Sequence, residues 1–147
     1  MWTGVAFQMT LDRVPLVYTG DEAGAGYRET GALFAPPLQS SPFLAYMKSL
    51  IALRRKEAAL RRGEFAEVSA RDSIYAFART LGSRRILVIL NNSAERCRAS
   101  FPIMGAAWAD CGLDDLLSGK PAKSVGVSTP LEVEPFGARI LSVSAGK

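Results

Sequence analysis

The pattern of apolar residues in the second half of the chain centres on the stretch between residues 73 and 92. Two apolar runs rich in β-branched and aromatic residues, starting at Ile74 and at Ile86, flank a short stretch that contains Gly82. That arrangement predicts a β-hairpin. The second run is apolar without interruption from Ile86 to Leu90, whereas a strand with one wet face would alternate. We therefore expect this strand to be central and covered on both faces.

Shorter candidate strands surround this hairpin. Residues 65–69 precede it, and three later segments alternate apolar with polar side chains: residues 97–103, 131–134 and 141–144. Strands at this spacing, joined by turns that contain Gly and Pro, indicate an antiparallel β-sandwich over residues 63–147. We expect this part to fold without the preceding residues, although its core would be modest and its central strand needs a cover on one face.

Before Gly63 the apolar period is helical. One face of a predicted helix over residues 1–12 carries four apolar side chains at helical spacing: Trp2, Val5, Ala6 and Met9. A second helix is predicted to begin at Pro42, with Ser41 as its cap, and to end at Gly63. Its buried face is expected to carry Phe43, Met47, Leu50, Ile51 and Ala58.

Between these helices, residues 14–18 form a short apolar run that predicts a strand. Pro15 lacks a backbone donor and is expected at the start of that strand or on an edge. Residues 19–40 are rich in Gly and Pro and predict a long loop. Gly63 therefore separates a helix–strand–helix unit from an all-β unit.

The amino-acid composition excludes several kinds of catalytic and metal site. The chain of 147 residues is 48% hydrophobic with a net charge of +4 and no histidine. Without histidine, a Ser-His-Asp triad, a Cys-His dyad and zinc sites that need imidazole are excluded. No apolar run is long enough to span a membrane. Cys97 and Cys111 do not make a disulfide scaffold; they could pair with each other, but two buried free thiols are favoured, which leaves the compartment open with a preference for the cytoplasm.

The segment from Val14 to Gly24 resembles the eighth barrel strand of the α-amylase family of glycoside hydrolases, which usually reads Gly-x-Pro-x-x-Tyr-x-Gly-x-Glu. The matching residues are Pro15, Tyr18, Gly20 and Glu22, while Arg13 stands where the first glycine is usual. Further segments agree in order. Residues 50–55 resemble the last barrel helix, residues 87–92 a strand of the C-terminal β-domain, and residues 115–119 and 135–139 its later turns.

This resemblance implies a mainly β fold with α: a C-terminal antiparallel β-sandwich of Greek-key type, preceded by the helix–strand–helix end of a truncated (β/α)8 barrel. Residues 1–62 would be the end of the catalytic barrel, and residues 63–147 the β-sandwich domain. The implied parent enzyme acts on α-glucosidic bonds of starch-like glucans. The implied partner is the missing barrel portion, which the β-domain covers and stabilises.

The chemistry of that family does not transfer onto this chain. A retaining glycosidase needs two carboxyl groups about 5 Å apart across the scissile bond, and the resemblance places them on earlier barrel strands. No catalytic residue, metal site or cofactor is therefore predicted here. Asp21 and Glu22 are adjacent and would point to opposite sides of an extended chain, so a loop-ordering role is favoured. Tyr27 and Arg28, in the same loop, are candidates for touching sugar in the whole enzyme.

Two other functions compete with this interpretation. Trp108 is a candidate sugar-stacking residue of a non-catalytic carbohydrate-binding module, although a core position is favoured. A basic cluster could meet phosphates, but a solvated helix face is favoured over nucleic-acid binding: Arg54, Arg55, Lys56, Arg61 and Arg62. We expect no nucleic acid or membrane partner, α-glucan as a candidate ligand, and self-association through residues 14–18 if that strand keeps free edges.

Overall fold

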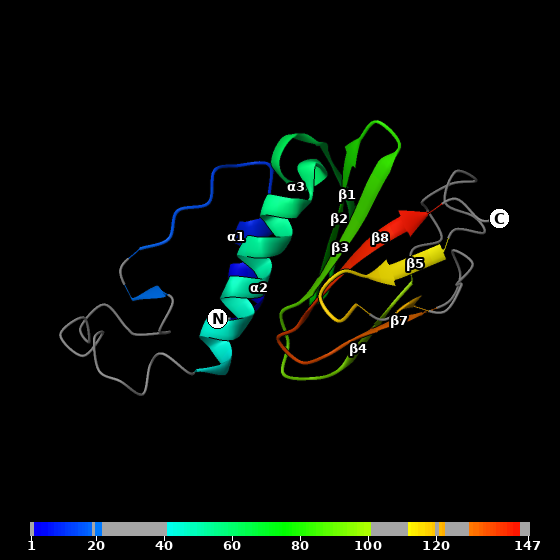
Figure 1. Ribbon diagram of the computed structural model, residues 1–147. Helices are drawn as coiled ribbons and strands as arrows, with labels where there is room; N and C mark the ends of the chain where they lie inside the picture. Colours follow the sequence, from blue (N-terminus) through cyan, green and yellow to red (C-terminus); the bar gives the residue numbers. More distant parts are fainter. Residues whose placement is uncertain are drawn as a thin grey trace.

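The computed structural model describes residues 2–18, 20–21, 41–100, 112–119, 121–122 and 130–144. Within these residues, three helices lie on one side of the strands (Figure 1). They are α1 (Trp2–Thr10), α2 (Pro42–Lys56) and α3 (Ala58–Arg62). The strands are β1 (Glu64–Arg71), β2 (Ile74–Leu81), β3 (Arg84–Asn91), β4 (Cys97–Ala99), β5 (Gly112–Asp115), β6 (Pro121–Ala122), β7 (Leu131–Val133) and β8 (Ala138–Ser144).

The strands form two antiparallel sheets. The larger has the order β1-β2-β3-β8-β5-β6, and β4 pairs with β7 in the smaller one. The predicted antiparallel β-sandwich is confirmed. The predicted strand over residues 65–69 is part of β1, and that over residues 97–103 forms β4 in its first half, while its second half lies outside the described residues.

The predicted central hairpin is formed by β2 and β3. Leu81 pairs with Arg84 across a two-residue turn in which Gly82 has φ +57°. A tight hairpin turn needs a positive φ, which glycine adopts without steric cost. The hairpin register is therefore fixed by local chemistry before any tertiary contact forms.

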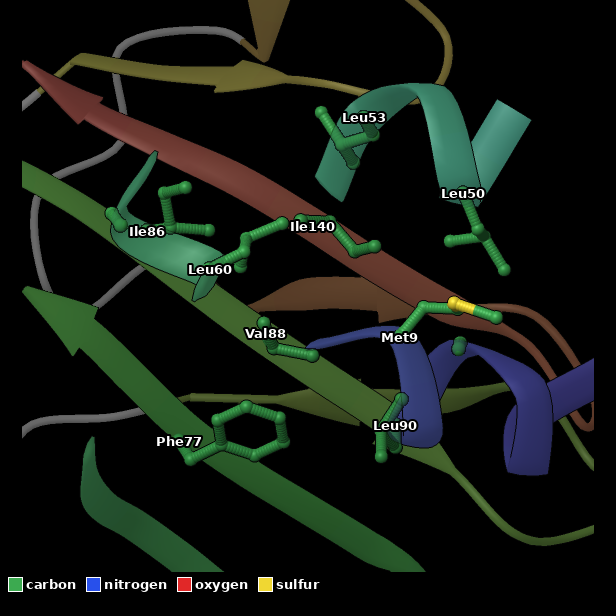
Figure 2. Close-up of a cluster of buried hydrophobic side chains, with 11 residues drawn as sticks. Met9, Leu50, Leu53, Leu60, Phe77, Ile86, Val88, Leu90 and Ile140 are labelled. Atoms are coloured by element: carbon green, nitrogen blue, oxygen red, sulfur yellow. The ribbon is translucent and has the colours of Figure 1, made fainter. Parts of the chain in front are cut away.

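Strand β3 is covered on both faces, as its uninterrupted apolar sequence predicts. Ile86, Val88 and Leu90 pack in a core on the helical side, and Leu87 and Ile89 pack in a second core on the side of β4 and β7. Figure 2 shows side chains of the helical side converging from the helices and from several strands. One strand thus contributes side chains to both of the cores formed by the described residues.

The helical core joins the helices to the sheet. It includes the following residues of α1, α2 and α3, in addition to those of the sheet: Ala6, Met9, Leu50, Leu53, Ala59 and Leu60. The predicted caps of α2 are present, since Pro42 begins the helix and the Ser41 hydroxyl accepts from the amide of Leu44 at 3.0 Å. Among the described residues, no helix is long and apolar enough to cross a membrane.

The second predicted helix is broken into α2 and α3 at Glu57. This residue is extended, with φ −90° and ψ 103°, and its buried carboxylate accepts from the Arg84 guanidinium at 2.7 and 3.0 Å. Glu57 thus leaves the helical conformation and forms an ion pair with the β2–β3 hairpin. After this break, α3 packs on the sheet. Sequence periodicity carries no signal for such a long-range partner.

Gly63 ends α3 where the chain passes very close to β2. A Cβ on Gly63 would lie 2.4 Å from the carbonyl oxygen of Ala59 and 2.8 Å from that of Thr80. Both neighbours are backbone atoms that cannot move aside. The predicted closing glycine is thus confirmed, and the required property is its missing side chain, because its φ of −71° suits any residue.

The strand predicted over residues 14–18 is wrong. The segment contains no strand, and its side chains are exposed apart from that of Pro15, which is half-buried. A strand needs a neighbour that completes its backbone hydrogen bonds, and none of the described strands lies beside this segment. Figure 1 shows the chain after α1 running on the side of the helices away from the sheet.

Candidate functional site

The segment that follows α1, residues 13–18, is called here the exit segment. It contains the most exposed large apolar side chains among the described residues: Val14 is 93% exposed, Leu16 74% and Tyr18 62%. A soluble protein rarely leaves several large apolar side chains together in water unless they meet a partner. The exit segment is therefore the candidate interaction surface of the chain.

A hollow of about 310 Å³ lies beside this segment. Its apolar wall comes from Pro15 and Val17 of the exit segment, Met9 of α1 and Ile51 of α2. Three arginines complete the lining: Arg54, Arg55 and Arg61. Apolar area bordered by long cationic side chains suits contact with another protein surface more than it suits cleavage of a bond.

Asp21 is placed just beyond the exit segment and orders the backbone there. Its carboxylate accepts from the amide of Tyr18 at 2.8 Å, and its own amide donates to the Tyr18 carbonyl at 3.0 Å. These reciprocal bonds close a tight turn. The contacts agree with a loop-ordering role for Asp21, whereas Glu22, Tyr27, Arg28 and Trp108 lie outside the described residues.

Arg54, near the end of α2, is buried and bonded to four backbone carbonyls. Its guanidinium donates to the carbonyls of Met9 at 2.8 Å, Leu11 at 2.9 Å, Arg13 at 2.7 Å and Leu60 at 3.0 Å. Carbonyls at the end of a helix lack intrahelical donors and carry partial negative charge. Arg54 therefore closes the C-terminal ends of both α1 and α3.

A second buried arginine, Arg79 of β2, binds backbone carbonyls at the ends of the same helices, α1 and α3. It donates to the carbonyls of Gly63 at 2.8 Å and Thr10 at 3.4 Å. Its side chain is fully buried, and its Nε has no hydrogen-bond partner. We call Arg54 and Arg79 the arginine clamp.

Burial shapes the electrostatics of the arginine clamp. Desolvation lowers the pKa of Arg54, and the charge of Arg61 lowers it further. Desolvation also lowers the pKa of Arg79, while the nearby charge of Asp12 acts in the opposite direction. Arginine keeps its proton at neutral pH despite such shifts. Helix-end carbonyls thus surround two buried cations, which are expensive to leave without partners.

Of the remaining cations of the basic cluster, Arg61 has a structural role, while Arg55, Lys56 and Arg62 are exposed. Arg61 donates to the carbonyls of Arg54, at 2.8 Å, and of Arg55, and so completes the end of α2. Arg54 and Arg61 are thus occupied by helix-end carbonyls, and the three other cations fit a solvated helix face. This arrangement favours the structural interpretation of the cluster over nucleic-acid binding.

Several carboxylates of the described part of the chain are held in structural ion pairs. Asp115 accepts from Arg139 at 2.7 Å and from the amides of Leu117 and Ser118. On the outer face of the smaller sheet, Glu132 and Glu134 pair with Arg98 and Arg96. Within the described ranges, no group of His, Cys, Asp and Glu could hold a metal ion. The arginine clamp can therefore position the backbone of the exit segment, and the exit segment can contact another protein surface.

Sequence reasoning identified Asp21 but missed the arginine clamp. Arg54 occupies the buried stripe of α2, one turn after Leu50 and Ile51, and Arg79 follows Phe77 on the helical face of β2. An arginine at a core position of an otherwise apolar pattern is the signal that would have found both. Cys97 is a free thiol, as predicted, but it is half-buried rather than buried, and Cys111 lies outside the described residues.

The comparisons with known proteins agree on one family. Residues 64–140 match the model of the maltogenic amylase C-terminal domain. The cyclomaltodextrinase of Geobacillus thermopakistaniensis (strain MAS1) is 29% identical over 95% of this chain, and neopullulanase 2 of Thermoactinomyces vulgaris is 31% identical over 93%. The chain spans 24% of the length of each of these curated relatives.

Solved structures show the same fold. An Anoxybacillus α-amylase matches 99% of this chain with a TM-score of 0.81 at 21% identity, and the match covers 32% of that protein. The α-amylase of Geobacillus thermoleovorans matches 99% of this chain with a TM-score of 0.79 at 16% identity, over 33% of its length. The chain therefore belongs to the maltogenic amylase C-terminal domain family, within the α-amylase family of glycoside hydrolases.

Proposed function

We propose that this chain is the C-terminal structural part of an enzyme that acts on α-glucosidic bonds of starch-like glucans, and that it stabilises a catalytic barrel without supplying catalytic residues. The exposed exit segment carries the proposal. Its apolar side chains lie on the helical side of the molecule, away from the closed β-sandwich, and need a protein partner to leave water.

The relatives support the glucan part of the proposal. Cyclomaltodextrinase and neopullulanase 2 are both much longer than this chain, which leaves room in those proteins for a catalytic barrel. We propose the division at Gly63, with residues 1–62 belonging to the barrel and residues 63–147 to the β-domain. In that arrangement the loop that begins at Asp21 would face the glucan, because active sites of such barrels lie at the ends of the strands.

Activity assays with and without a partner test this function. The partner is neopullulanase 2 from which the region aligned with this chain has been deleted. The chain alone should not hydrolyse starch, maltodextrin or nitrophenyl-α-glucoside, because retaining hydrolysis needs a carboxylate pair that no predicted site provides. Added to the shortened enzyme, it should raise the unfolding temperature and the release of reducing sugar from starch.

A matched variant separates specific docking from general protection. Val17→Lys places a charge on the exit segment at a half-exposed position, so it should weaken the effect on the shortened enzyme and leave the unfolding temperature of the chain itself unchanged. Equal effects of the variant and the unaltered chain would contradict docking through this segment. Hydrolysis by the chain alone, lost on Asp21→Asn or Glu22→Gln, would overturn the structural role.

A further inference from the structure

The carbonyls held by Arg54 follow one another along the chain. They belong to Met9, in the last turn of α1, to Leu11 just after it, and to Arg13 at the start of the exit segment. A single side chain thus binds the backbone at three successive points between α1 and the exit segment. The fourth carbonyl, that of Leu60, lies in α3 and ties this path to the element that packs on the sheet.

Arg13 is the last of these fixed points. Beyond it, the next backbone anchor in the exit segment is the carbonyl of Leu16, which accepts from the side chain of Gln8. Val14 and Leu16 are mostly in water, and only Pro15 and Val17 line the hollow beside α1 and α2. The direction in which the exit segment leaves α1 is therefore first set where Arg54 holds the carbonyl of Arg13.

We infer that Arg54 is the positioning residue of the exit segment, and that it fixes this segment in the orientation in which it meets its partner. The guanidinium is suited to this task because its N–H groups form a planar, rigid fork that can serve several carbonyls together. Arg79 assists by holding Thr10 and Gly63. The consequence for docking rests on the proposed function, whereas the positioning itself does not.

A purely structural role for Arg54 would have a different signature. If Arg54 only filled the core between the helices, its loss would weaken the whole fold and free every part of it to the same extent. If it positions the exit segment, its loss should free the backbone at Arg13 while the sheet stays closed. The two roles are separated by a measurement that reports on Arg13 and on the core at once.

Trypsin supplies that measurement, because it cleaves after arginine and must take the carbonyl of that arginine into its oxyanion hole. The carbonyl of Arg13 is the one that Arg54 holds at 2.7 Å. Cleavage after Arg79, which is fully buried in β2, reports on opening of the sheet. Mass spectrometry follows the two cleavages in the same digest of the full chain.

Arg54→Met keeps much of the side-chain length and removes every donor. It should speed cleavage after Arg13 by at least about tenfold, as expected for loss of a charge-assisted hydrogen bond, and change cleavage after Arg79 much less. Arg54→Lys keeps the charge but loses the fork, so its rate should lie between those of Arg54→Met and the unaltered chain. Arg55→Met removes the exposed neighbouring arginine and should behave like the unaltered chain.

Equal acceleration at Arg13 and Arg79 in both Arg54 variants would overturn the inference, and so would an unchanged rate at Arg13 in Arg54→Met. If Arg54→Met is unfolded at the assay temperature, Arg54→Lys decides by the ratio of the two cleavage rates. The digest contains neither glucan nor a partner protein. A failure of docking would therefore leave this result intact, and a failure here would leave the docking result intact.

Discussion

Two apolar runs of five residues differ in burial: one lies in the core and the other is largely exposed to solvent. Residues 86–90 of β3 are at most 4% exposed, whereas the side chains of residues 14 and 16–18 in the exit segment are 43% to 93% exposed. Both runs are rich in Val, Leu and other large apolar residues. Hydrophobicity alone therefore does not decide which of them enters the core.

The difference lies in the neighbours of each run. Strand β3 pairs with β2 on one edge and β8 on the other, so its backbone polar groups are satisfied before its side chains are buried. The exit segment has no paired strand among the described elements, and Pro15 lacks an amide donor. An apolar run becomes a core strand only when something completes its backbone hydrogen bonds.

Removing residues 1–62 is expected to have the largest effect. It would expose the helical face of the sheet, including Phe77, Ile86, Val88, Leu90 and Ile140. The sequence predicts that residues 63–147 fold alone, but the three helices share a core with the sheet. We therefore expect instead that the shortened chain, residues 63–147, melts without cooperativity and binds the dye ANS, as loosely packed proteins do. A cooperative melt at the temperature of the full chain would mean that the core beside β4 and β7 suffices alone.

A matched pair of leucine substitutions measures how much each apolar run contributes to the free energy of unfolding. Leu87→Ala, in β3, should lower the free energy of unfolding by about 2–5 kcal/mol, because it leaves a cavity in a packed core. Leu16→Ala, in the exit segment, should change it by less than about 0.5 kcal/mol. Urea denaturation of both variants gives the two values, and similar losses would show that the exit segment is buried in solution.

Alkaline pH should weaken the helical cover by a smaller amount. Burial, aided by the charge of Asp115, raises the pKa of Tyr46 to about 12. The unfolded value is about 10, so the folded state favours the neutral phenol. The contribution of Tyr46 is complete below pH 10 and is lost as the pH rises through 12, by about 1–2 kcal/mol once partial solvent screening is allowed for.

Denaturation curves between pH 9 and pH 12 test this dependence. Tyr46→Phe should flatten the decline in the free energy of unfolding, and Tyr18→Phe, which removes an exposed phenol, is the control for loss of a tyrosine. An identical decline in Tyr46→Phe and the unaltered chain would show that other groups cause it.

Much of the fold could be predicted because its signals are local. Gly82 marks a hairpin whose strands read as β-branched and aromatic runs, and Ser41 with Pro42 marks the start of α2. The break at Glu57 could not be predicted, since it depends on Arg84, which is distant in sequence. The predicted strand over residues 14–18 was wrong for a related reason: its pattern was suitable, but no strand of the described part pairs with it.

The candidate site was predicted only in part. Asp21 was singled out as one of two adjacent carboxylates in the segment that resembles the eighth barrel strand, and its turn with Tyr18 fits the expected loop-ordering role. Arg54 was counted among exposed cations because composition treats every arginine alike. Its function depends on four carbonyls, three of which are more than 40 residues away in sequence, and no sequence pattern records those contacts.

The place of β8 in the larger sheet has a consequence for how the chain is made. This strand is the last one described, yet it lies between β3 and β5 and pairs Arg85 with Val143. During synthesis, β3 must therefore leave the ribosome before β8, with the backbone N–H and C=O groups of one edge unpaired. Such delayed pairing slows folding and leaves an unpaired strand edge that other chains can bind. A newly made chain is thus most vulnerable to aggregation, and most in need of a chaperone, in the interval before residues 138–144 emerge.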